Sequence, residues 1–137
     1  MNNQATTYNL NNLNNPNNMA QWRGQVWNAL RTDNVTMFSS LFPDEQRVRD
    51  ASYDIWAPRE PPTNRPLLDV VASIRPHIHD GQPALRCLRW LMETYPNVYD
   101  VADIQWVITR NEHAMENDVN VQEGYQAINQ CLSEFTP

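Results

Sequence analysis

The sequence predicts an all-α fold of six or seven short helices packed as helical hairpins, preceded by a disordered Asn-rich arm. Three observations lead to this prediction. Apolar residues recur at steps of three and four along most of the chain, which is the spacing of one helix face. No segment alternates clearly between apolar and polar residues, as a half-buried strand would. Only three glycines occur, and no Asn-Gly or Asp-Gly turn joins two alternating runs, so a fold rich in β-hairpins is not expected.

The predicted arm spans residues 1–18, and nine of these eighteen residues are Asn. Asn forms helices and strands poorly because its side chain competes for backbone hydrogen bonds. Residues 19–137 are predicted to form a single helical domain. A chain of 137 residues is long enough to bury a core without a disulfide or metal to hold it.

Three helices are expected in residues 19–57. The first follows Asn18, a candidate N-cap, and ends at residues 32–34 (Thr-Asp-Asn), which interrupt the apolar spacing. A second, short helix occupies residues 35–42. Pro43 then starts the third helix, with two acidic residues in the first turn, where the helix dipole favours negative charge.

Prolines divide the remaining chain into shorter helical segments. The expected helices cover residues 67–74, 84–95, 98–108 and 121–135. Pro96 ends the second of these, and Asn97 is the expected cap of the next. Residues 111–118 (NEHAMEND) are polar and are predicted to form a turn or a frayed helix end.

The charge of the chain argues against some partners. The formal net charge is −6, which disfavours non-specific binding to nucleic acid or to an anionic membrane. All ten basic residues are Arg, and Lys does not occur. Codon bias or an overlapping reading frame would explain this, as would selection against ubiquitination or a preference for bidentate Arg contacts. The last two explanations favour a protein that acts inside a eukaryotic cell or an assembly.

The sequence predicts an intracellular protein, cytoplasmic or nuclear, with no membrane contact. No apolar segment follows a basic start, so no signal peptide is expected. No run of eighteen apolar residues could span a bilayer. Cys87 and Cys131 fall among apolar helical positions, and we predict that both are buried and reduced.

The chain contains no familiar catalytic motif, so we predict neither enzymatic activity nor a cofactor. A phosphate-binding loop, a nucleophile elbow and a zinc-binding helix motif are all missing. The residues His77 and His79, with Asp80, could bind zinc if their backbone is extended. The alternative, which we favour, is an exposed loop in which Asp80 caps a helix. Asp100 and Asp103 are either a carboxylate pair or part of a solvated helix face.

Tryptophan points to candidate contact residues. The chain has five tryptophans, and Trp is enriched at the energetic centres of protein interfaces. Trp90 and Trp106 fall outside the main apolar stripes of their helices, which predicts that they bind a partner. Alternatively, they widen the buried stripe of a central helix.

Arginines near Trp90 form a second candidate. Arg86 and Arg89 share a helix face, and Arg75 lies shortly before them. Arg beside an aromatic ring can bind phosphate and stack on bases. These arginines could equally pair with acids such as Glu93. We therefore assign Arg86 and Arg89 to a protein-binding surface, and all three arginines to an RNA-binding surface under the alternative function.

Residues 22–42 resemble the opening helical hairpin of an ankyrin-repeat protein, with a polar break between two helices. Residues 65–95 resemble a second hairpin, in which Arg-Pro-Leu-Leu (65–68) stands where the family has Thr-Pro-Leu-His. Residues 103–135 would be a third pair. The Thr and His of the signature are missing, and residues 43–57 add a helix that the 33-residue period lacks. The resemblance implies a protein-binding scaffold without catalysis.

These observations lead to one main hypothesis and two alternatives. The main hypothesis is a non-enzymatic protein–protein interaction module inside a cell; composition suggests a viral or pathogen-delivered factor that binds host proteins. The first alternative is a self-assembling coat or nucleocapsid-like protein that contacts RNA through Arg75, Arg86 and Arg89. The second is a small metal-dependent enzyme or sensor built around His77 and His79. Both the main hypothesis and the first alternative are compatible with self-association of the chain into a homo-oligomer.

Overall fold

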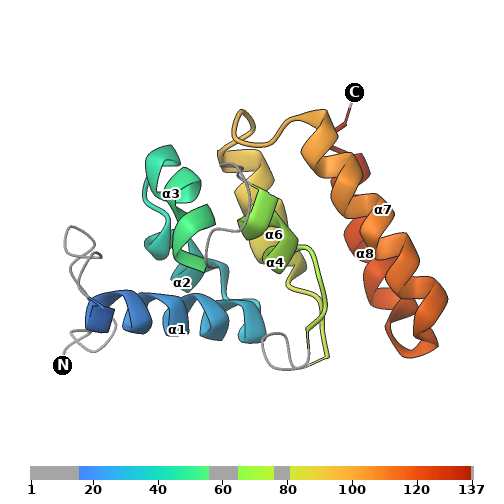
Figure 1. The fold of residues 1–137 in the computed structure, drawn as a ribbon, viewed down its shortest axis with the longest axis horizontal. Coiled ribbons are helices and arrows are strands. Elements are labelled where there is room, and N and C mark those ends of the chain that lie inside the picture. The colour runs from blue at the N-terminus through green and yellow to red at the C-terminus, as the bar shows by residue number, and fades with distance from the viewer. Residues whose placement is uncertain (1–15, 56–64, 76–80, 137) are drawn as a thin grey trace.

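The computed structural model describes residues 16–55, 65–75 and 81–136, and in these segments the fold is all-α, as predicted (Figure 1). The helices are α1 (Pro16–Thr32), α2 (Val35–Leu41), α3 (Glu45–Ile55), α4 (Arg65–Val71), α6 (Leu85–Thr94), α7 (Val101–Asn117) and α8 (Gln122–Ser133), with a 3₁₀ turn η3 (Val119–Val121) before α8. No strand occurs in the described segments. Almost all of the predicted arm lies outside them.

The helices are arranged in three groups along the molecule (Figure 1). Helices α1, α2 and α3 lie at one end, α4 and α6 in the middle, and α7 and α8 at the other end. Helix α6 packs against α2, α4 and α8, so it joins the two ends. Buried side chains from the three groups form one hydrophobic cluster. None of the described helices is both long and apolar enough to cross a membrane.

The hairpin of α1 and α2 is fixed by a buried tryptophan. Trp22 and Val26 face the core at a four-residue step, which places them on one side of α1. The indole N–H of Trp22 donates to the backbone carbonyl of Leu41 at 3.2 Å, and its ring meets Phe42 edge to face at 5.5 Å. The indole is thus buried with its polar atom satisfied, as a buried Trp requires.

The turn between α1 and α2 also caps a distant helix. Asp33 has a positive φ of 49°, a conformation that Asp tolerates better than most residues. Its carboxylate accepts hydrogen bonds from the backbone N–H groups of Arg86 at 3.1 Å and Cys87 at 3.0 Å. The N-cap residue of α6 is Ala84, which has no polar side chain. Asp33 therefore satisfies the free N–H groups of a helix that begins more than fifty residues later.

A buried polar network joins α4, α7 and α8. Asn111 of α7 is fully buried, and its Nδ2 donates to the carbonyl of Ala72 at 3.2 Å and to Oδ1 of Asn129 at 2.9 Å. Arg110 donates to Oδ1 of Asn111 at 2.7 Å and to the carbonyl of Ala72 at 3.0 Å. The same guanidinium pairs with Asp69. Burial lowers the pKa of Arg110, and Asp69 opposes that shift.

The network explains why one sequence prediction is wrong. Residues 111–118 were expected to form a turn or a frayed helix end, but α7 continues as a regular helix to Asn117. The apolar stripe of this helix is interrupted by Asn111, which takes a core position because its amide finds partners there. A buried amide in a helix stripe looks polar in sequence, so the pattern seemed to end too early.

Three predicted helix starts are also wrong. Helix α3 begins at Glu45 and not at Pro43, and the Asp44 carboxylate before it accepts from the N–H of Arg47 at 2.8 Å. Helix α1 begins at Pro16, before the expected cap Asn18, and Pro is well suited to the first turn of a helix.

Helix α7 is capped by Asp100 and not by Asn97. The Asp100 carboxylate accepts from the N–H of Asp103 at 2.8 Å, and the Asp103 carboxylate accepts from the N–H of Asp100 at 3.4 Å. The two acids thus form a capping box that stabilises the helix start.

Candidate functional site

The metal-binding candidate lies outside the described residues, because His77, His79 and Asp80 fall in the segment 76–80. Within the described residues, no group of three or more His, Cys, Asp or Glu side chains could hold a metal ion.

Both cysteines are buried and free, as predicted. Burial, reinforced by the nearby Asp33 carboxylate, strongly raises the pKa of the Cys87 thiol. The pKa of Cys131 is raised as well, first by burial. A thiol reacts as a nucleophile through its thiolate, so these environments disfavour nucleophilic chemistry at either cysteine.

The arginine candidates have different surroundings. Arg89 forms a bidentate ion pair with Glu134 of α8 at 2.9 and 3.2 Å. The hydrogen bond to Glu134 raises the pKa of Arg89, and Arg89 in turn lowers the pKa of Glu134. The Nε of Arg75 donates to Ser73 at 3.2 Å. Arg86 is exposed. The charge of Arg89 is therefore largely offset by an acid of the same chain.

The two tryptophan candidates differ in exposure. Trp90 is half-buried and packs edge to face against Phe38 at 5.7 Å and against Tyr95 at 5.6 Å. This is the surrounding expected of a side chain that widens the core. Trp106 is 44% exposed on α7. A partner contact stays a prediction for both, but Trp106 is the more accessible.

The outer face of α7 is the surface on which Trp106 lies. We define this face by its exposed side chains, which are Ala102, Gln105, Trp106, Thr109, Glu112, His113 and Glu116. Helix α7 packs on α8 and α4 and lies at one end of the molecule (Figure 1). From Ile104 to Thr109 the helix carries no charged residue. The neighbours of Trp106 on the helix surface, three and four residues away, are Ala102, Asp103, Thr109 and Arg110. Asp103 belongs to the capping box and Arg110 pairs with Asp69, whereas Glu112 and Glu116 make the C-terminal half of the face acidic.

The sequence pattern could have located this face only in part. Trp106 was found because it falls outside the apolar stripe. Glu112 and Glu116 were missed because residues 111–118 were expected to form a turn or a frayed helix end. If Asn111 is accepted as a core residue, the helical spacing of inward-facing residues continues through Ala114 and Met115, which are both half-buried. That continuation would have placed Glu112 and Glu116 on a helix.

The net charge of the protein is concentrated in the segment that contains α7 and α8. Residues 98–137 contain seven of the sixteen acidic residues and one of the ten arginines, which gives the segment a formal charge of −6. Residues 1–97 contain nine of each and are neutral. The single arginine, Arg110, is bound to Asp69. A negative field therefore surrounds the α7–α8 hairpin.

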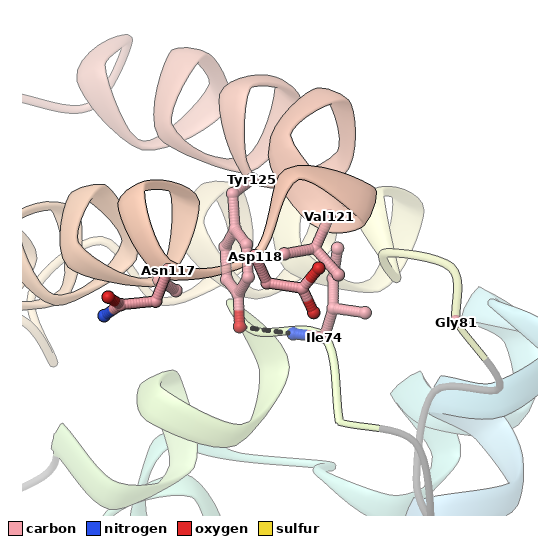
Figure 2. A pocket seen from close by; sticks show the side chains of 7 residues that line it. Ile74, Gly81, Asn117, Asp118, Val121 and Tyr125 are labelled. Atoms are coloured by element: carbon pink, nitrogen blue, oxygen red, sulfur yellow. Dashed lines mark hydrogen bonds between the residues drawn. The ribbon is translucent and has the colours of Figure 1, made fainter.

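A pocket of about 470 Å³ lies between the end of α4 and the α7–α8 connection. It is lined by Ile74, Gly81, Ala114, Asn117, Asp118, Val121 and Tyr125 (Figure 2). The hydroxyl of Tyr125 accepts a hydrogen bond from the N–H of Ile74 at 3.1 Å. The Asp118 carboxylate accepts from the N–H of Asn120 at 3.0 Å, and the Asn117 amide donates to the carbonyl of His113. The polar groups of the lining thus already serve local structure.

Comparison with known protein families, curated proteins and solved structures gives no match to this chain.

Proposed function

We propose that this protein is a non-enzymatic protein-binding module and that the outer face of α7 is its contact surface. The main support is Trp106, which is 44% exposed at the centre of an uncharged stretch of helix. Trp combines a large apolar area with an indole N–H, and interface residues that contribute most to affinity are enriched in it. The exposed Val101 near the start of the same helix adds apolar area.

The chemistry of the described residues supports binding more than catalysis. The two thiols are buried, and burial raises their pKa values. Asp100 and Asp103, the one carboxylate pair that the sequence offered for acid–base work, are occupied in capping α7. Action inside a cell, origin in a virus or pathogen, and kinship with ankyrin repeats stay hypotheses from the sequence.

The RNA-binding coat protein has weaker support. Arg89 is paired with Glu134, and the α7–α8 segment is negative, so it would repel a phosphate backbone. Light scattering during size-exclusion chromatography, with absorbance at 260 and 280 nm, tests this alternative. A monomer or dimer free of nucleic acid contradicts a coat, whereas a large RNA-containing assembly contradicts our proposal.

A display selection tests the proposed face. Peptides that bind the folded protein would be selected from a random library and measured against Trp106→Ala. The control is Val119→Ala, which removes an apolar side chain from η3 that is 73% exposed. We expect Trp106→Ala to abolish binding of most selected peptides and Val119→Ala to leave it unchanged. If the selected peptides bind Trp106→Ala as well as the original protein, the outer face of α7 is not the contact surface.

A further inference from the structure

Most acidic residues of the α7–α8 segment have a structural role. Asp100 and Asp103 form the capping box of α7. Asp118 caps η3. Glu123 lies in the first turn of α8, where the helix dipole favours negative charge. Glu134 pairs with Arg89. The negative charge of these five residues is therefore explained by helix capping, by the helix dipole or by an ion pair within the chain.

Glu112 and Glu116 have no comparable role. Both are exposed on the outer face of α7, one turn apart, so their charges repel. Glu116 lies in the last turn of the helix, where the dipole disfavours negative charge, and this turn contains no basic residue. Glu116 lies 3.7 Å from Nδ1 of His113. Glu112 makes no hydrogen bond or ion pair with any part of the chain that the structure describes. These two charges act against the stability of α7.

The position of the two acids relative to Trp106 defines a surface with two parts. Glu112 and Glu116 follow Trp106 by six and ten residues, which corresponds to about 9 and about 15 Å along the helix axis. Around the axis, the two acids are displaced from Trp106 by about 120° and about 80° in the same direction, whereas His113 is displaced by only about 20°. A complementary surface would therefore present an apolar group against Trp106 and positive groups about two to three helical turns away.

We propose that the outer face of α7 binds a basic amphipathic helix of another protein, with an apolar residue over Trp106 and Arg or Lys side chains toward Glu112 and Glu116. This inference rests on the proposed function and adds the kind of partner. Charge complementarity carries it, because negative charge that destabilises α7 becomes favourable once a positive partner is bound. The described residues offer no sheet edge to which a strand could add, whereas an exposed helix face accepts another helix by ridges-into-grooves packing.

The same charges disfavour two other occupants. A second copy of this chain would bring another segment of charge −6 against the first if the two faces met. An anionic membrane surface would be repelled for the same reason. The partner is thus a different protein whose contact helix is positively charged.

Three synthetic helical peptides of about five turns test the inference. The first carries Leu on one face and Arg toward one end; the second has Glu in place of Arg; the third has Ser in place of Leu. Binding would be measured by fluorescence anisotropy of labelled peptide. We expect the first peptide to bind and the other two to bind at least roughly tenfold more weakly. The affinity of the first peptide should also fall when the salt concentration is raised from about 0.05 M to about 0.3 M.

Protein variants separate a specific site from general charge attraction. Glu112→Gln with Glu116→Gln should weaken the first peptide by roughly five- to tenfold. The control Asp50→Asn with Glu93→Gln also removes two exposed charges, but from α3 and α6, and should leave the affinity nearly unchanged. Circular dichroism establishes that each variant is folded.

The possible results decide between the two proposals. Equal loss in the two double variants, or equal binding of the Arg and Glu peptides, would overturn the basic helix as partner. No binding of the first peptide would overturn it too. If any of these results is obtained but the display-selected peptides bind Trp106→Ala more weakly than the original protein, the proposed function stands without this inference.

Discussion

Asp33 links the α1–α2 turn to the start of α6, and replacing it should destabilise the whole protein. Its carboxylate accepts two backbone N–H groups, at 3.1 and 3.0 Å, from a helix whose own N-cap residue is Ala84. Loss of an N-cap side chain costs about 0.5–2 kcal/mol, and the negative charge at a helix N-terminus contributes about 0.3–1 kcal/mol more. The φ of 49° adds about 1 kcal/mol for a residue such as Ala in the left-handed region.

Three substitutions at this position separate the two effects. Asp33→Ala loses the cap and strains the turn, so we expect a loss of about 2–3 kcal/mol in the free energy of unfolding. Asp33→Gly loses the cap but relieves the strain, so a loss of about 1–2 kcal/mol is expected. Asp33→Asn keeps one acceptor and tolerates the turn, so its loss should stay below about 1 kcal/mol.

Urea unfolding followed by circular dichroism and tryptophan fluorescence would measure the series. Tryptophans lie in α1, α6 and α7, so fluorescence reports on both ends of the molecule. The order Ala, Gly, Asn from most to least destabilised is the result that the geometry requires. Three equal losses, or losses under about 0.5 kcal/mol, would refute the idea that Asp33 caps α6 and bears backbone strain.

Three further predictions concern α7 and α8. Arg89 lowers the pKa of Glu134 in the folded protein. The pair should therefore stabilise the fold at pH values above the pKa that this carboxyl group has in the unfolded chain, and the stabilisation should be lost as pH falls through its pKa in the folded protein. Arg89→Gln should reduce the decrease in melting temperature between about pH 5 and pH 3. Glu112→Gln with Glu116→Gln should raise stability by about 0.5–1 kcal/mol in urea unfolding, since it removes a repulsion and the unfavourable contact of Glu116 with the helix dipole; unchanged or lower stability would contradict this account. Asn111→Ala should lower stability by about 2–3 kcal/mol, because the buried polar groups of its partners lose a hydrogen bond; a loss near that of an exposed residue would contradict the network.

Much of the helical fold follows from local sequence pattern. The spacing of Trp22, Val26 and Leu30 predicts one buried face of α1, and all three are buried. The polar break at residues 32–34 correctly separates α1 from α2. Such features depend on residues a few positions apart, so a single sequence contains them.

Features that depend on distant residues could not be predicted. Asp33 caps a helix 53 residues away, and nothing near it in sequence indicates that role. Trp90 and Trp106 look alike on their helices, yet Phe38 packs on the ring of Trp90, whereas Trp106 stays 44% exposed. Exposure depends on which neighbouring element covers a side chain, and that information is tertiary.

The buried amide of Asn111 and the half-buried amide of Asn129 have a consequence for the alignment of α7 on α8. Two apolar helices can slide past each other by one turn with little change in the area they bury, because leucines and valines pack in many ways. The amide of Asn111, by contrast, donates to Oδ1 of Asn129 at 2.9 Å, and the amide of Asn129 donates to the carbonyl of Ile108 at 3.3 Å. A slip of one turn breaks both bonds, one of them at a buried amide. These bonds therefore favour one register of α7 on α8. Trp106 and the two acids behind it stand at fixed positions before a partner arrives, so little ordering of the helix backbone is left for the binding step.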